Sequence, residues 1–252
     1  MTTSLADLLS ELRACRWVDL THAFEPGIPH YAGFPDEQRE VLYHFDEGVG
    51  SMGTGFLAHE YRHVGQWGTH CDPPAHFVRD GRTQDEIGVE EMVLSLVVLD
   101  VSDAVAADAD LAVGVREIEA DEALHGRIPD GAFVALHTGW AARWPDGDAM
   151  ADRDADGVSH APGWGVDALR LLVEERAVTA VGHDVTDTDP GSRVSAGEVP
   201  AETYLLGADR WQLELMANLG ELPARGALIV ATWPKPKGGT GFPARAFAIV
   251  PR

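Results

Sequence analysis

Cysteine and basic residues are both scarce in this sequence. Of its 252 residues only two are cysteine, Cys15 and Cys71. Two cysteines cannot form a disulfide framework, and their scarcity indicates a reducing compartment, so we expect a cytoplasmic protein. Lys and Arg total 19 against 41 Asp and Glu, which gives a formal net charge of −22. Because nucleic acids and anionic membranes bind basic surfaces, this charge argues against both as partners.

Long hydrophobic runs are also missing. No run of about 18 apolar residues is present, so the sequence predicts no membrane-spanning helix. Asp7 and Glu11 lie near the N-terminus, where no basic region leads into a long apolar core, so we expect no secretory signal. A glycine-rich strand-to-helix turn of the phosphate-binding kind is absent too, which argues against nucleotide dependence. What is present is an ordinary globular composition, with 45% hydrophobic and 24% charged residues.

The hydrophobic patterns predict helices interleaved with strands. The helices are expected over residues 4–14 and 166–176, and the strands over 17–20, 41–45, 94–101, 133–137, 178–181, 227–232 and 246–250. This order indicates the α/β class, and the strands near both ends indicate a mixed β-sheet flanked by helices. The acidic segment 146–156 is too short to be a convincing linker, so we expect one domain over residues 1–252. A glycine-rich stretch, residues 48–55, is expected to be a mobile loop.

The densest group of chemically active side chains lies within residues 63–76. Its three imidazoles, one carboxylate and one amide belong to His63, His70, His76, Asp72 and Gln66. Two glycines let the backbone turn and two consecutive prolines stop a helix, so we expect an irregular loop that gathers these side chains around one point. His70 and Asp72 are candidates for divalent metal ligands, and His76 is a candidate acid or base.

Other interpretations of this stretch stay open. His59 or His63 could join the metal site, and neither has a spacing that decides the matter. The polar side chains could instead cap turns and fix the loop without binding a metal. Cys71 lies between two candidate ligands, but in an extended loop its neighbours point in other directions, so it is a weak candidate as a ligand or nucleophile.

The stretch Gly68-Thr69-His70-x-Asp72-x-Pro74-x-His76 resembles a known signature. It is similar to the HxGTHxDxPxH motif of the cyclase-like metal-dependent hydrolases, a family that includes bacterial kynurenine formamidase and isatin hydrolase. The likeness runs over most of the chain. Supporting segments are found at residues 19–22, 26–27, 182–184, 187–191, 218–223 and 237–245.

The resemblance implies a role for each motif position. In the formamidases the first His, the second His and the Asp of the motif bind metal, and the third His acts in catalysis. The matching positions here are Gln66, His70, Asp72 and His76. The implied fold is a single α/β domain of the kynurenine formamidase-like kind, and the implied assembly is a homodimer or homotetramer.

Two later ligands in the family are a His and a Glu twelve residues apart. The same spacing here joins Glu202 to Glu214, so a Glu stands where the family has a His. The sequence therefore departs from the formamidase pattern at Gln66 and Glu202, which argues against kynurenine formamidase itself and against zinc. A ligand set with one imidazole and several oxygens is hard and favours Mn²⁺, so we expect manganese first and zinc second.

The expected activity is hydrolysis of a small amide, lactam or related carbonyl substrate at a C–N bond. A divalent ion lowers the pKa of bound water, and His76 would move the proton from this water to the leaving group. Alternatives are a metal-dependent cyclase, a lactone hydrolase, or a catalytically silent binding member of the family. A compensating cation for an anionic substrate could come from Lys235, Lys237 or Arg245, although solvated surface cations are the commoner interpretation.

Five further residues are candidates for substrate contact. His183 and Asp184 follow a predicted strand, where α/β proteins gather their sites, although they could simply form a turn. His22 and His160 are candidates by the family resemblance alone. Trp67 could line an aromatic pocket, although an aromatic side chain is more often part of the core.

Overall fold

A mixed nine-stranded sheet forms the centre of the molecule. The structure is a computed structural model that describes residues 4–46 and 55–252. The strand order is β1-β13-β11-β5-β7-β9-β10-β4-β12. The strands of this sheet are β1 (Arg16–Asp19), β4 (His70–Asp72), β5 (Val93–Asp100), β7 (Phe133–His137), β9 (Ala180–His183), β10 (Trp211–Glu214), β11 (Ala227–Thr232), β12 (Phe242–Pro243) and β13 (Arg245–Val250).

Four central strands, β5, β7, β9 and β10, run parallel to one another. The strands on either side, β11, β13 and β1 at one edge and β4 and β12 at the other, pair antiparallel. The expected mixed α/β sheet is therefore confirmed. Because β1 lies next to β13, the first and last strands of the chain are joined in the same sheet.

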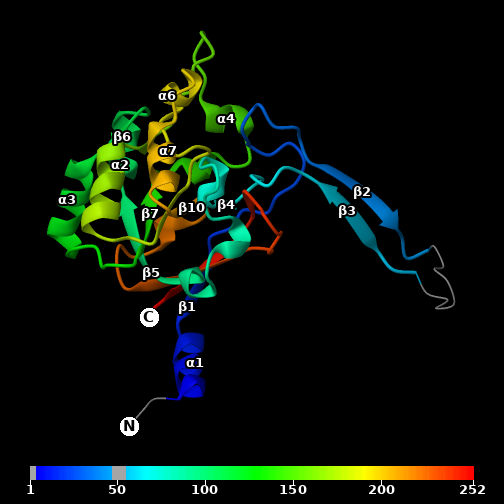
Figure 1. Cartoon of the computed structure of the whole chain (residues 1–252), viewed down its shortest axis with the longest axis horizontal. Helices are drawn as coiled ribbons and strands as arrows, with labels where there is room; N and C mark the ends of the chain where they lie inside the picture. Colours follow the sequence, from blue (N-terminus) through cyan, green and yellow to red (C-terminus); the bar gives the residue numbers. More distant parts are fainter. Residues whose placement is uncertain (1–3, 47–54) are drawn as a thin grey trace.

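Apolar side chains on the two faces of the sheet form separate cores. On β5, Val97 and Leu99 belong to one core, and Leu96 and Val98 belong to the other. Since successive side chains of a strand alternate between faces, a strand buried on both sides must be apolar throughout. Helices cover the face that carries Val97 (Figure 1). The helices are α2 (Ser102–Ala107), α3 (Val115–His125), α4 (Gly147–Ala151), α5 (Val166–Arg170), α6 (Gly191–Ser195) and α7 (Pro200–Gly207).

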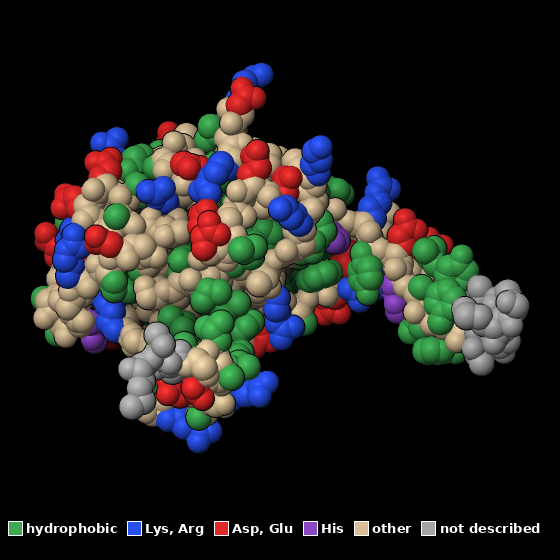
Figure 2. Space-filling model, turned by 60° about the horizontal axis from the view of Figure 1, so that its bottom comes forward, with side chains coloured by type: hydrophobic (Ala, Val, Ile, Leu, Met, Phe, Trp, Pro, Cys, Tyr) green, Lys and Arg blue, Asp and Glu red, His purple; other side chains and the backbone are tan. Residues whose placement is uncertain are grey.

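Two elements extend away from this body. Strands β2 (Gln38–Tyr43) and β3 (Ala58–Arg62) pair only with each other and project as a hairpin, which we call the arm (Figure 1). Helix α1 (Leu5–Ala14) also stands apart and buries no residue. Figure 2 shows hydrophobic side chains gathered on the arm. A further small sheet joins β6 (Ala112–Val113) to β8 (Gly163–Trp164).

Most predicted elements are present with shifted ends. The helix predicted at the N-terminus is confirmed, with Ser4 as its cap and Asp7 completing a capping box. The helix predicted over 166–176 changes to a wider turn at Leu171–Glu175. The loop predicted over 48–55 lies almost wholly outside the described residues. Across 4–46 and 55–252, none of the helices combines the length and the apolar character that crossing a bilayer requires.

Candidate metal centre

The predicted ligands His70 and Asp72 lie on a strand, so the prediction of an irregular loop is wrong for residues 70–72, whereas residues 63–69 are irregular as predicted. Strand β4 pairs antiparallel with β10, which places His70 opposite Glu214 and Asp72 opposite Gln212. Because side chains alternate along a strand, residues two apart share a face. Four polar side chains from two strands therefore gather on one face, while Cys71 points to the other.

Cys71 is a core residue. It is fully buried in the same apolar core as Leu213, the residue directly opposite it on β10. Burial raises the pKa of its thiol well above the usual value, and the nearby charge of Asp72 adds to this effect. A buried, protonated thiol on the far face of the sheet supplies neither a ligand nor a nucleophile to the polar cluster.

His70 is oriented for binding a cation. Its Nδ1 donates a hydrogen bond to the carbonyl oxygen of Gly68 at 2.8 Å, which leaves Nε2 with its lone pair free. This Nε2 is buried, has no hydrogen-bond partner, and lies 3.2 Å from Oδ2 of Asp72 and 3.4 Å from Oε2 of Glu214. Burial lowers the pKa of His70, but Asp72 and Glu214 outweigh it and raise this pKa well above the usual value. The site therefore holds a positive charge between an imidazole nitrogen and two carboxylates, and these three residues fit a divalent metal in place of the proton.

A second group of donors shares Asp72 with the first. His76 lies on a 3₁₀ turn, Pro74–His76, and Glu202 lies on α7. One ligand atom from each of Asp72, His76 and Glu202 lies within 4.8 Å of the other two, and the same holds for the group with His70 and Glu214. Five of the six side chains predicted for the metal and its catalytic base therefore belong to these two groups.

The buried carboxylates repel one another, and a nearby positive charge would stabilise their ionised forms. Burial raises the pKa of Glu202 well above its usual value, and the carboxylates of Glu214 and Asp72 raise it further. Burial alone would also raise the pKa of Glu214, but the imidazoles of His183 and His70, each 3.4 Å from one of its oxygens, outweigh it and lower this pKa to about 2. A divalent cation would remove the repulsion among these groups, because opposite charge favours the ionised carboxylate.

Gln66 presents its amide nitrogen, not its oxygen, to the cluster. Its Nε2 donates to the carbonyl oxygen of Thr240 at 2.7 Å and to Oδ1 of Asp72 at 3.1 Å. Both partners are acceptors only, so the group that faces them must be the NH₂. Gly241 makes this approach possible, because a Cβ there would lie 2.0 Å from Nε2. Gln66 thus orients Asp72 in this structure, which differs from its predicted role as an oxygen ligand.

Gln212 is a site residue that the sequence analysis missed. Its amide nitrogen lies 3.0 Å from Oε1 of Glu214 and 3.1 Å from Oε1 of Glu202, and its oxygen accepts a hydrogen bond from Thr188 at 2.7 Å. The amide therefore links two of the carboxylates. Its only sequence signal is a position two residues before Glu214, on the same face of β10.

His183 and Asp184 are adjacent in sequence but contact different parts of the structure. His183 is buried, and its Nε2 lies 3.4 Å from Oε1 of Glu214, so it contacts one carboxylate of the cluster. Asp184 accepts hydrogen bonds from the backbone N–H and the hydroxyl of Thr138 and from the N–H of Gly139. These bonds hold the turn after β7. Asp184 thus takes the turn-forming role that was left open.

Three other predicted contacts lie away from the cluster. Trp67 is fully buried, and its indole N–H donates to Glu37 at 3.1 Å. His160 lies between Asp110 at 2.6 Å and Asp154 at 3.5 Å. His22 stacks on Trp144 beside a separate cavity, so none of the three lines the cavity at the cluster. Aromatic packing and local ion pairs explain all three placements.

A cavity of about 340 Å³ opens onto the cluster. Gln66, His70, His76, Glu202 and Glu214 line it together with aromatic residues. The side chains that complete one wall are His30, Tyr31, Phe34 and Phe77. Polar groups converging at one end of a partly apolar cavity are typical of a small-molecule site.

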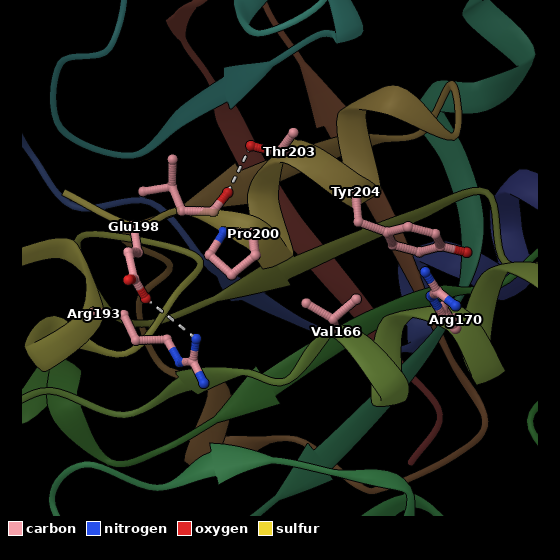
Figure 3. Close-up of a pocket in the computed structure, with 8 residues that line it drawn as sticks. Val166, Arg170, Arg193, Glu198, Pro200, Thr203 and Tyr204 are labelled. Carbon is pink, nitrogen blue, oxygen red and sulfur yellow. Dashed lines mark hydrogen bonds and ion pairs between the residues drawn. The ribbon is translucent and has the colours of Figure 1, made fainter. Parts of the chain in front are cut away.

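A different hollow, of about 620 Å³, lies between α5 and α7 (Figure 3). Arg193 pairs there with Glu198 at 3.6 Å, and the guanidinium of Arg170 lies over the ring of Tyr204. None of the predicted site residues lines this hollow. Because its cations already have partners, the cavity at the carboxylate cluster is the better candidate for an active site.

Comparison with known proteins agrees with this geometry. A family model described as "Putative cyclase" matches residues 18–190, more than half of the chain. The isatin hydrolase of Roseibium aggregatum is 35% identical over 248 residues, which cover 93% of this chain and 92% of that protein. Isatin hydrolase A from Labrenzia aggregata, solved bound to benzyl benzoate, is 33% identical with a TM-score of 0.87, over 99% of this chain and 100% of that one.

A second solved structure is an isatin hydrolase bound to the product analogue thioisatinate. It is 30% identical to this chain with a TM-score of 0.87, over 99% of this chain and 100% of that chain. The similarity extends over nearly the whole length in sequence and in structure. The chain therefore belongs to the cyclase family of metal-dependent hydrolases.

Proposed function

We propose that this chain is a metal-dependent hydrolase that opens a small cyclic amide of the isatin type. One observation supports the proposal above all others: the buried, unpartnered Nε2 of His70 faces carboxylate oxygens of Asp72 and Glu214. The relatives that act on or bind such compounds, isatin hydrolase and the thioisatinate complex, indicate the substrate class.

The proposed metal ligands are His70, Asp72 and Glu214, with Glu202 as a further carboxylate. A divalent cation held there would lower the pKa of a bound water and polarise a substrate carbonyl. One imidazole with several carboxylates is an oxygen-rich donor set, which favours Mn²⁺ over Zn²⁺. In this proposal Gln66 orients Asp72 through its N–H, and Gln212 links Glu202 and Glu214 through its amide nitrogen.

His76 is the proposed general acid and base. It is half-buried, lines the cavity, and its Nδ1 lies 3.4 Å from the amide nitrogen of Gln66. This contact places the imidazole of His76 beside the side chain that orients Asp72. As the water oxygen bonds to the carbonyl carbon and the C–N bond breaks, His76 carries one proton from the water to the leaving nitrogen.

We also propose that the active form is a homo-oligomer in which the arm of each copy contacts another copy. A lone two-stranded hairpin is only marginally stable in water. The arm nevertheless exposes many large apolar side chains, which is unfavourable unless another surface covers them (Figure 2). These side chains are Val41, Leu42, Tyr43, Phe45, Phe56, Leu57 and Tyr61.

Elemental analysis of wild type and Asp72→Ala tests the metal proposal. We expect near-stoichiometric manganese or zinc in the wild type, loss of that metal in the variant, and metal-dependent opening of isatin by the wild type only. No metal in the wild type after incubation with Mn²⁺ and Zn²⁺ would overturn the proposal. Bound metal with turnover of lactones alone, and of no lactam, would replace the substrate class and keep the site.

A further inference from the structure

A second cavity lies next to the one at the metal cluster. It measures about 520 Å³ and lies among the loop of residues 27–32, helix α4 and helix α6. Figure 1 shows α4 and α6 close together at one end of the molecule. The residues that line both cavities are His30, Tyr31, Thr186, Asp187 and Val194. Since five residues border both spaces, the two cavities are adjacent.

The border between the two cavities is built from anchored side chains. Nδ1 of His30 hydrogen-bonds to the carbonyl oxygen of Ile28 at 2.6 Å, and its ring packs on the buried indole of Trp67. Tyr31 packs edge-on against Phe34, with ring centroids 5.2 Å apart. These contacts hold His30 and Tyr31 in place, so the border between the two cavities is part of the folded structure.

Arg153 is the one arginine among the described residues that lines either cavity, and its side chain is exposed. No other Lys or Arg among the described residues lines either space, and no described carboxylate lies within ion-pair distance of its guanidinium. By contrast, the nearby Arg143 pairs with Asp152 at 3.0 Å. A bridge between the backbones of Arg153 and Ser159 holds the segment that carries this side chain. Arg153 thus has an open position for an anionic partner.

Two carboxylates also line the second cavity, Asp148 on α4 and Asp187 at the border. Together with Glu214 in the first cavity, these carboxylates disfavour an anion that has no cationic partner. The overall charge of −22 acts in the same direction. The guanidinium of Arg153 can hold a carboxylate here through paired N–H donors.

We propose that the second cavity is a substrate subsite, and that the preferred substrate is a lactam whose ring carries a carboxylate-bearing substituent that reaches Arg153. This inference rests on the proposed lactam hydrolysis for its chemistry, while the subsite itself depends only on the cavity and Arg153. The lactam carbonyl lies at the metal cluster, and the substituent passes between His30 and Asp187.

The test compares each ring-carboxylated regioisomer of isatin with its neutral carboxamide. The measured quantity is the ratio of kcat/KM for carboxylate over carboxamide, in manganese-loaded wild type and in Arg153→Ala. A charge-assisted pair predicts that the ratio falls about tenfold in the variant for at least one regioisomer, which corresponds to about 1.4 kcal/mol. Arg153→Lys should retain part of the preference. Unsubstituted isatin should react equally with all three proteins.

Arg116→Ala is the matched control. It removes the same charge from an exposed arginine that lines neither cavity, and it should leave every ratio unchanged. If Arg153→Ala changes no ratio, or Arg116→Ala changes the ratios equally, the subsite is wrong.

If the wild type opens no isatin, the proposed function fails, and calorimetric titration then tests the subsite alone. Tenfold tighter binding of a carboxylate than of its carboxamide, lost in Arg153→Ala, would support the subsite. Equal binding of the two would overturn it.

Discussion

His70 and Glu214 are directly opposite each other on antiparallel strands β4 and β10, with Nε2 of the imidazole 3.4 Å from Oε2 of the carboxylate. The pair joins a segment near residue 70 to one near residue 214, and the sheet register alone brings them together. Because a register slip of one residue would turn the side chain of the slipped strand to the apolar face and separate the pair, the metal centre depends on correct pairing of these strands.

Glu214→Gln should remove metal without unfolding the protein. The amide keeps the size of the side chain but loses the charge that balances a divalent ion, so we expect the metal affinity to fall at least tenfold and isatin opening to fall with it. Cys71→Ala is the control on the opposite face: it should keep full metal content and cost about 1 kcal/mol of stability. Inductively coupled plasma analysis and denaturant unfolding measure both quantities. Full metal content in Glu214→Gln would contradict the assignment.

Gln66→Glu should reduce the rate of isatin opening relative to the wild type. A carboxylate cannot donate to the carbonyl oxygen of Thr240 or to Asp72, and it adds negative charge beside Asp72. We expect kcat for isatin opening to fall about tenfold or more. Gln66→His places the family's residue at this position and should bind zinc more tightly than the wild type does. Metal competition and steady-state kinetics measure both effects. If Gln66→Glu raises manganese affinity, Gln66 is instead an oxygen ligand.

The sequence predicted those elements whose pattern is contained in a few consecutive residues. The apolar runs at 94–101 and 133–137 identified two central strands because both faces of these strands are buried. Strand β4 escaped prediction because it has only three residues and prolines follow it. Its neighbours β10 and β12 stabilise it as a strand, and they are distant in sequence.

The candidate site was predictable only in part. His70 and Asp72 carried a recognisable motif, and the spacing of Glu202 and Glu214 came with the family resemblance. Gln212 had no signal of its own, since its role follows from the register that places it opposite Asp72. The same holds for Arg153, which becomes notable only when the fold shows that it lines a cavity and lacks an ionic partner.

The arm should carry the contact between copies. A double variant with Tyr43→Ser and Phe45→Ser removes two exposed aromatic rings, so we expect an oligomer in the wild type and a monomer in the variant. Light scattering after size-exclusion chromatography measures the mass. A double variant with Val89→Ser and Leu124→Ser is the control, because those side chains are 75% and 80% exposed and lie outside the arm. A monomeric wild type, or a control that dissociates equally, would contradict the proposal.

The stability of the protein should depend on His22 in mildly acidic solution. Burial lowers the pKa of His22 to about 4, although Asp19 acts in the opposite direction. Because the unfolded chain binds the proton first, the contribution of neutral His22 is complete above about pH 6.5 and is lost as the pH falls towards 4. The free energy of unfolding of wild type relative to His22→Gln should therefore decrease by about 1 kcal/mol between pH 7 and pH 5, a value reduced for partial solvent exposure. Urea unfolding at a series of pH values measures the difference, and a difference that stays constant over this range would show that His22 is not held neutral by burial.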